Sequence, residues 1–102
     1  MYLPVSLFGG LYYGLLDSGA TASVIGGKGW ERLKQLGVFV RPSKYSAVKV
    51  ANGKHCTVLG EIEIPLKIES RSKLCTFIVV PDIVQEVILG LDLWELFGLV
   101  PM

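Results

Sequence analysis

The chain has 102 residues, which is long enough for one domain with a hydrophobic core and too short for a second lobe, so residues 1–102 are expected to form a single domain. Hydrophobic residues make up 51% of the sequence, charged residues make up 19%, and the formal net charge is +1. The Lys and Arg residues are scattered rather than clustered, so we expect no nucleic-acid partner. The high apolar fraction of so small a chain predicts instead that another chain covers part of its surface.

Membrane insertion and secretion are also not expected. No uninterrupted apolar stretch reaches the roughly 18 residues that a membrane-spanning helix needs. The N-terminus lacks a basic segment followed by an apolar core and a cleavage site. We therefore expect a cytoplasmic protein without a membrane partner.

The cysteine content points in the same direction. Cys56 and Cys75 are too few for a disulfide scaffold and do not form a Cys-x-x-Cys pair. Only His55 could join them at a metal ion, and a single histidine on a polar hairpin is usually solvated. We predict no metal, no other cofactor, and two buried or partly buried thiols in a reducing compartment.

The first predicted elements are two strands that lead to an acidic residue. Val5–Phe8 and Leu11–Leu16 flank Gly9-Gly10, a dipeptide that suits a two-residue hairpin turn. Asp17 follows the second strand where the chain leaves the core, and Ser18 and Gly19 come next. One interpretation is that Asp17 caps an ordinary turn. The other is that a carboxylate between leucines and a Gly-Ala pair is costly unless its environment is used for chemistry.

The next segment is short and apolar. Val24-Ile25 is expected to be buried, and the Gly26-Gly27 pair breaks the chain after it. Trp30, Leu33 and Leu36 are spaced by three residues, which predicts a short helix or helical turn that ends at Gly37. We expect its apolar side to lie on the sheet and assign it no chemistry.

A hairpin is predicted in the middle of the chain. Val48–Val50 and Cys56–Val58 alternate around Ala51-Asn52-Gly53-Lys54, and Asn-Gly between alternating runs is a strong hairpin signal. The tip carries few large apolar residues, which indicates a projecting arm. It can be an ordinary solvent-facing hairpin or a mobile flap over a cleft.

The second half of the chain predicts two long strands, one short strand and a helix. Glu61–Ile68 alternates strictly between polar and apolar residues, with Glu61 and Glu63 on a solvated sheet surface. Leu74–Val80 is a predicted buried strand, and Val87–Leu89 is an apolar run before Gly90. Leu91–Gly98 is a predicted helix with Asp92 near its N-terminus, where an acidic side chain is favourable.

Three segments together resemble the retroviral-type aspartic proteases. They are Leu15-Leu16-Asp17-Ser18-Gly19-Ala20, the hairpin with Ala51-Asn52-Gly53 at its tip, and Ile88-Leu89-Gly90-Leu91-Asp92 before a short helix. The resemblance covers nearly the whole chain in the right order, and it is closest to the branch in Ty3/gypsy-type retrotransposons and their domesticated relatives. It implies an all-β fold, a single retropepsin-like lobe with an acid-protease β-barrel, a flap hairpin and one short C-terminal helix.

The resemblance also implies an activity. The chain has one Asp-Ser-Gly motif, so the implied enzyme is a homodimer with one Asp17 from each subunit on a twofold axis. The two carboxylates then lie close together on the axis, share one proton and activate a water molecule without a metal or cofactor. The implied function is an aspartic endopeptidase that cuts extended polypeptides such as a retrotransposon polyprotein, with virus-like particles as one setting in the cytoplasm.

Residue roles follow from the matched positions. The resemblance assigns catalysis to Asp17 with Ser18 and Gly19, where Ser18 hydrogen-bonds across the twofold axis and Gly19 lets the substrate backbone approach. The implied substrate-binding residues are those of the cleft wall, the flap tip and a side-chain pocket: Ala20, Thr21, Val50, Ala51, Asn52, Gly53 and Ile88.

The sequence departs from the family pattern at two places. Many proteases of this type have an acidic residue and an arginine that form an ion pair at the positions of Thr21 and Leu91. We therefore expect that different contacts, which involve Asp92, support the dimer interface in this chain. The C-terminal stretch Leu99–Met102 contains Pro101, which removes a backbone donor and predicts a weaker terminal sheet. Two further functions stay open: a catalytically silent dimeric binding or assembly module on the same fold, and a structural β-domain that merely contains Asp-Ser-Gly.

Overall fold

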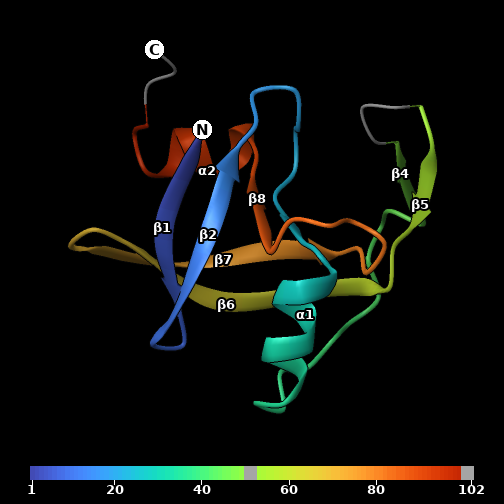
Figure 1. Ribbon diagram of the computed structural model, residues 1–102, viewed down its shortest axis with the longest axis horizontal. Coiled ribbons are helices and arrows are strands. Elements are labelled where there is room, and N and C mark those ends of the chain that lie inside the picture. Colours follow the sequence, from blue (N-terminus) through green and yellow to red (C-terminus); the bar gives the residue numbers. More distant parts are fainter. Residues whose placement is uncertain (50–52, 100–102) are drawn as a thin grey trace.

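The computed structural model describes residues 1–49 and 53–99 of the chain. In these residues six strands close into a barrel in the order β1-β2-β8-β3-β7-β6, and β4 and β5 form a separate two-stranded hairpin. Figure 1 shows this hairpin at one end of the long β6–β7 ribbon. The strands are β1 Tyr2–Leu7, β2 Gly10–Leu16, β3 Val24–Ile25, β4 Ala47–Lys49, β5 His55–Thr57, β6 Gly60–Ile68, β7 Arg71–Val79 and β8 Val87–Leu89.

The first hairpin is confirmed, but its turn is shifted by one residue from the prediction. Leu7 pairs with Gly10, so the two turn residues are Phe8 and Gly9 rather than Gly9 and Gly10. Both have positive φ, 50° at Phe8 and 78° at Gly9, as a type I′ turn requires. This turn matches the twist of the two strands, which outweighs the cost of the left-handed conformation at Phe8.

The strands β6 and β7 form the longest pairing of the barrel, from Gly60↔Val79 to Ile68↔Arg71. The alternation predicted for β6 is confirmed, because Ile62, Ile64, Leu66 and Ile68 are buried. The expectation for β7 was wrong at its start. The strand begins at Arg71, and Leu74 is 62% exposed on its outer face. Only the second half of β7 is buried on both faces, because only there does a second apolar layer cover it.

Two apolar clusters hold the fold together. The larger fills the barrel and extends to the helices α1 (Gly27–Lys34) and α2 (Leu91–Leu96) through Leu33, Leu93 and Trp94. The smaller lies between the barrel wall and the β4–β5 hairpin, and its buried members are Val24, Cys56, Ile78, Val80 and Ile83. Burial of this much apolar side chain is the main stabilising contribution to so small a domain.

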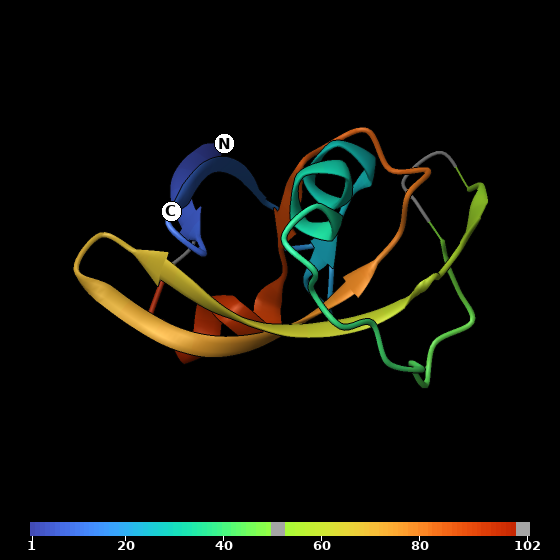
Figure 2. The same ribbon diagram turned by 90° about the horizontal axis from the view of Figure 1, so that it is seen from below.

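Both helices are present where helices were predicted, with α1 starting three residues earlier, at Gly27. Gly37 and Gly98 follow the helices at φ of 75° and 65°, as expected for glycines that end them. Figure 2 shows α1 and α2 at separate places along the β6–β7 ribbon. No helix in the described part of the chain is long and apolar enough to cross a membrane.

Both cysteines are free and buried, as predicted. Cys56 lies in the smaller cluster and Cys75 in the larger one. Burial, with a smaller contribution from the negative charge of Asp92, raises the pKa of the Cys75 thiol to about 11. The Cys75 thiol is therefore neutral and unreactive near pH 7.

Candidate active site

Asp17 lies directly after β2, at the point where that strand ends beside β8. The two strands are parallel, with Leu16 opposite Leu89, and the Asp17 N–H donates a hydrogen bond of 3.1 Å to the Leu89 carbonyl. This bond extends the β2–β8 pairing by one residue and fixes the backbone of Asp17 to the barrel. The Asp17 side chain is half-buried in the single chain.

The residues after Asp17 form a tight turn. The Asp17 Oδ1 accepts a hydrogen bond of 2.9 Å from the Gly19 N–H, and the Asp17 carbonyl accepts one of 3.1 Å from the Ala20 N–H. Asp17 therefore does cap a turn, as one of the two interpretations of the sequence predicted. Within residues 1–49 and 53–99, Oδ2 of Asp17 has no protein hydrogen-bond partner, and Ser18 and Gly19 are exposed. The turn holds the carboxylate at the surface of the chain and leaves one of its oxygens available.

The support for this turn comes from β8 and the start of α2. The Leu91 N–H donates a 2.8 Å hydrogen bond to the Ala20 carbonyl. Gly90 lies so close beneath the loop that a Cβ atom on it would be 2.7 Å from the Ala20 carbonyl oxygen and 2.8 Å from the Ala22 carbonyl. The Leu89-Gly90 pair packs beneath the loop. The indole Nε1–H of Trp94 adds a buried 2.9 Å hydrogen bond to Leu89.

Sequence reasoning missed Ser23, which completes this support. Ser23 is 1% exposed, and its hydroxyl donates a 2.7 Å hydrogen bond to Asp92 Oδ1. Asp92 also lies at the first turn of α2, where its Oδ1 accepts a 2.8 Å bond from the Leu93 N–H. The available signal was a lone hydroxyl beside the apolar Val24-Ile25 strand, because buried polar groups need partners.

Two residues of the predicted cleft wall lie in the same region. Ala20 is half-buried and Thr21 is exposed. Thr21 also lines a hollow of about 610 Å³ that extends from the Asp17 loop toward the segment before β4. The hollow is lined by Thr21, Ala22, Ser23 and Asp92 from the loop and its support, and by Lys44 and Tyr45 from the other side.

The β4–β5 hairpin forms as predicted, with Val48 opposite Cys56 and Lys49 opposite His55. Val48 and Cys56 face the smaller apolar cluster, while Lys49 and His55 are exposed on the other face. The predicted flap-tip residues Val50, Ala51 and Asn52 lie outside the described residues. Gly53 is described, exposed and at φ 85°.

The predicted pocket residue Ile88 is half-buried and packs against the same cluster as Val48 and Ala22. The structure therefore brings the hairpin, the Asp17 loop and β8 to one apolar cluster. In the described part of the chain, no group of His, Cys, Asp and Glu side chains is arranged to hold a metal ion.

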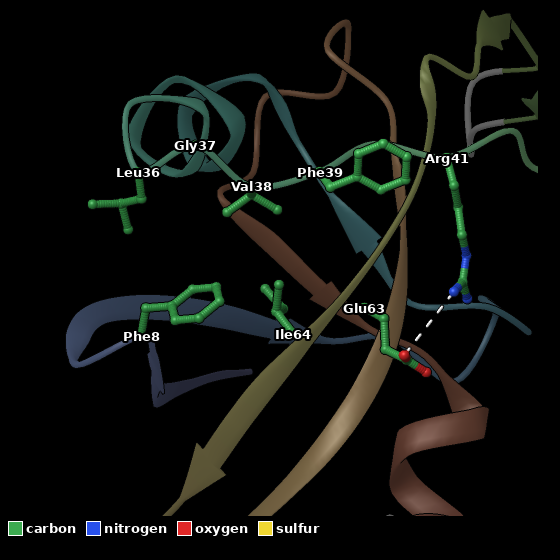
Figure 3. A pocket seen from close by; sticks show the side chains of 8 residues that line it. All are labelled: Phe8, Leu36, Gly37, Val38, Phe39, Arg41, Glu63 and Ile64. Atoms are coloured by element: carbon green, nitrogen blue, oxygen red, sulfur yellow. Dashed lines mark ion pairs between the residues drawn. The ribbon is translucent and has the colours of Figure 1, made fainter.

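A second hollow, of about 520 Å³, lies away from Asp17 and involves none of the predicted site residues. Figure 3 shows it between the Phe8 turn, the segment after α1, and β6. Arg41 lies at one end of this hollow. Its Nη1 is 4.0 Å from the Glu63 Oε1, and its Nε is 2.8 Å from the Glu61 Oε2. Glu61 is thus only 19% exposed and paired rather than fully solvated as predicted, because Arg41 crosses the sheet surface.

Comparison with known proteins supports the fold. No protein-family model and no curated protein matches the chain. Among solved structures, the retroviral protease-like domain of Ddi1 from Leishmania major matches at 25% identity and a TM-score of 0.72, over 96% of this chain and 77% of that one. EIAV protease in complex with the inhibitor HBY-793 matches at 22% identity and a TM-score of 0.80, over 100% of this chain and 91% of that one. The fold is that of the retroviral proteases.

The retropepsin-like fold confirms the predicted architecture: a mostly β lobe with a six-stranded barrel, a hairpin and a short C-terminal helix. The two positions at which the resemblance implies an ion pair hold the uncharged Thr21 and Leu91, while Asp92 hydrogen-bonds to Ser23 of its own chain.

Proposed function

We propose that this chain is one subunit of a homodimeric aspartic endopeptidase. The observation that carries the proposal is the placement of Asp17 on a retropepsin-like barrel. Its backbone is fixed to β8, Oδ1 accepts a hydrogen bond from the Gly19 N–H, and Ser18 and Gly19 are exposed. One such turn supplies a single carboxylate, so the site is complete only when a second chain brings another Asp17.

The proposed chemistry needs only the two carboxylates and water. At about 3 Å two carboxylates cannot both be charged, so the pair holds one proton. The ionised Asp17 takes a proton from the bound water as the water oxygen bonds to the scissile carbonyl carbon, while the protonated Asp17 donates a hydrogen bond to the carbonyl oxygen. The leaving nitrogen then takes the proton removed from water from the Asp17 that accepted it, and the C–N bond breaks as the carbonyl re-forms, which returns the pair to its one shared proton. Ser18 is proposed to hydrogen-bond across the twofold axis and hold the two turns together.

The proposed substrate is a polypeptide in extended form that lies between the Asp17 turns and the β4–β5 hairpins. The hairpin tip, residues 50–53, is proposed to close over it by strand-like backbone pairing. Ala20 and Thr21 are proposed to line the cleft. Ile88 is proposed to line a pocket for an apolar side chain, since it packs in a cluster with Val48 and Ala22. A retrotransposon-type polyprotein of the Ty3/gypsy branch, processed in the cytoplasm, is the natural substrate that we propose.

A peptide-library cleavage assay at acidic and neutral pH tests this function, with Asp17→Asn as the matched control. An asparagine can still accept the Gly19 N–H hydrogen bond, so the variant removes the acid and keeps the turn. We expect cleavage by the wild type and none by Asp17→Asn. Cleavage that survives in Asp17→Asn would contradict the mechanism. No cleavage by a wild-type dimer would favour a catalytically silent assembly module on the same fold.

A further inference from the structure

Among the described residues, Ser23 is the polar residue with a buried side chain. Its carbonyl accepts a 3.0 Å hydrogen bond from the Ile78 N–H of β7, and its other hydrogen bonds lead to the support beneath Asp17. Its Oγ–H donates to Asp92 Oδ1 at 2.7 Å, and its Oγ accepts the Gly90 N–H at 2.9 Å. Its own N–H donates to Asp92 Oδ2 at 3.3 Å. One serine thus connects the end of the Asp17 loop to β8 and to the first turn of α2.

The loop between Asp17 and Ser23 is fastened to the same short stretch of chain at three points. At its start the Asp17 N–H bonds to the Leu89 carbonyl, and in its middle the Ala20 carbonyl accepts the Leu91 N–H. At its end Ser23 bonds to Gly90 and Asp92. Among these contacts only those at the end use side chains, so only there can a substitution remove hydrogen bonds without a change of backbone.

The hydrogen bond from the Ser23 hydroxyl to Asp92 is stronger than a hydrogen bond between neutral groups. The acceptor of the Ser23 hydroxyl is a carboxylate, and hydrogen bonds to charged groups are shorter and stronger than neutral ones. Ser23 is 1% exposed, so the loss of Asp92 leaves its buried hydroxyl without that acceptor, which is costly. All partners belong to one chain, so the arrangement exists before any second chain binds.

We propose that Ser23 and Asp92 are positioning residues that hold the Asp17 turn in its catalytic shape within each single chain. The catalytic consequence rests on the proposed protease function. The two chains then meet as preformed halves, and dimer formation does not have to order the loop. Displacement of a catalytic group by about 1 Å can cost a hundredfold in rate, so the fixed end of the loop matters to turnover rather than to substrate affinity.

The test compares Ser23→Ala, Asp92→Ala and Asp92→Asn with Ser72→Ala, which removes an exposed hydroxyl at the far end of β7. We expect Ser23→Ala and Asp92→Ala to lower kcat by about 10- to 100-fold with KM changed by less than about threefold. Asp92→Asn keeps an oxygen acceptor for the Ser23 hydroxyl and is expected to recover most of kcat. Ser72→Ala is expected to match the wild type.

Amide hydrogen exchange, measured on single chains before they dimerise, gives a readout that does not depend on cleavage. We expect the Asp17 and Ala20 amides to exchange at least about tenfold faster in Ser23→Ala, with the amides of β6 unchanged. Faster exchange at Asp17 in Ser23→Ala than in the wild type, together with a wild type that does not cleave, would support the positioning role and reject the protease function. Three results would overturn the proposal. They are equal amide exchange in Ser23→Ala and wild type, an equal increase in exchange throughout the barrel of Ser23→Ala, and a kcat for Asp92→Asn as low as that of Asp92→Ala.

Discussion

Gly90 offers the sharpest structural perturbation of the candidate site, because Gly90→Ala adds one methyl group directly beneath the Asp17 loop. That Cβ would lie 2.7 Å from the Ala20 carbonyl oxygen and 2.8 Å from the Ala22 carbonyl, so these backbone atoms must move by roughly 0.7 Å to reach ordinary contact. The φ of Gly90 is −84°, which alanine adopts readily, so the clash and not the backbone conformation sets the cost. Overpacking of this kind costs about 1 to 3 kcal/mol.

We expect the Gly90→Ala chain to fold with a Tm lowered by about 5 to 15 °C. Its kcat per folded molecule should fall about tenfold or more, because the loop that carries Asp17 is displaced. The control is Leu7→Ala, which removes a fully buried side chain at the end of β1 that is distant from Asp17. This substitution should lower the free energy of unfolding by about 3 kcal/mol. Circular dichroism gives the Tm, and cleavage is compared at temperatures where both variants are folded. Equal activity per folded molecule in Gly90→Ala and Leu7→Ala would refute the link between Gly90 and the catalytic loop.

Three further predictions concern the scaffold. Arg32→Ala should lower the free energy of unfolding by about 1 to 2 kcal/mol in urea denaturation, because Arg32 bonds to the Leu11 carbonyl at 2.7 Å, pairs with Glu86 at 3.1 Å and stacks over a tyrosine ring. Trp94→Phe should cost about 1 to 3 kcal/mol in the same assay, because it removes a buried indole hydrogen bond. Cys75 should resist iodoacetamide at pH 8 in the folded chain, and its contribution to stability should decline as pH rises from about 9 to about 11.

The sign of the Cys75 effect follows from proton binding. The folded-state pKa of about 11 lies above the ordinary value of 9.0, so between these pH values the unfolded chain releases this proton while the folded chain keeps it. Stability therefore falls with rising pH, by up to roughly 2 to 3 kcal/mol at the top of this range. The measured quantity is the difference in unfolding free energy between wild type and Cys75→Ala. A difference independent of pH from 8 to 11 would contradict the assigned pKa.

Controls exist for the other two scaffold predictions. Lys34 forms an exposed pair with Glu31 at 3.0 Å, so Lys34→Ala should change stability by less than about 0.5 kcal/mol. If Arg32→Ala lowered stability as little as Lys34→Ala, the contacts of Arg32 with Leu11 and Tyr12 of β2 would add nothing measurable to stability. For Trp94, unchanged stability in the phenylalanine variant would show that the hydrogen bond to Leu89 adds nothing to packing.

Much of the fold was predictable because its strands carry strong local signals. The alternation of Glu61–Ile68 and the Asn-Gly hairpin signal specify β6 and the β4–β5 pair directly. The turn at Phe8 was misplaced because strand twist, a property of two strands together, selected the turn residues. The exposure of Leu74 was missed for a related reason, since which half of β7 is covered depends on residues distant in sequence.

The candidate site divides in the same way. The position of Asp17 at the end of an apolar strand could be read from one short motif. Ser23 could not, because its partner Asp92 is 69 residues away and only the closed barrel brings them together. Arg41 likewise joins Glu61 across the sheet surface from an irregular segment that has no periodicity to interpret.

The most direct test of the central claim is a mixing experiment with wild-type and Asp17→Asn chains. The wild-type concentration is held fixed, Asp17→Asn is added in increasing excess, and albumin replaces it in the control. If the site needs one Asp17 from each chain, a tenfold excess of freely exchanging Asp17→Asn should reduce cleavage to about one tenth, because nearly all wild-type chains then sit in mixed dimers. Cleavage that stays constant as Asp17→Asn is added would show that each chain acts alone and would contradict the shared site.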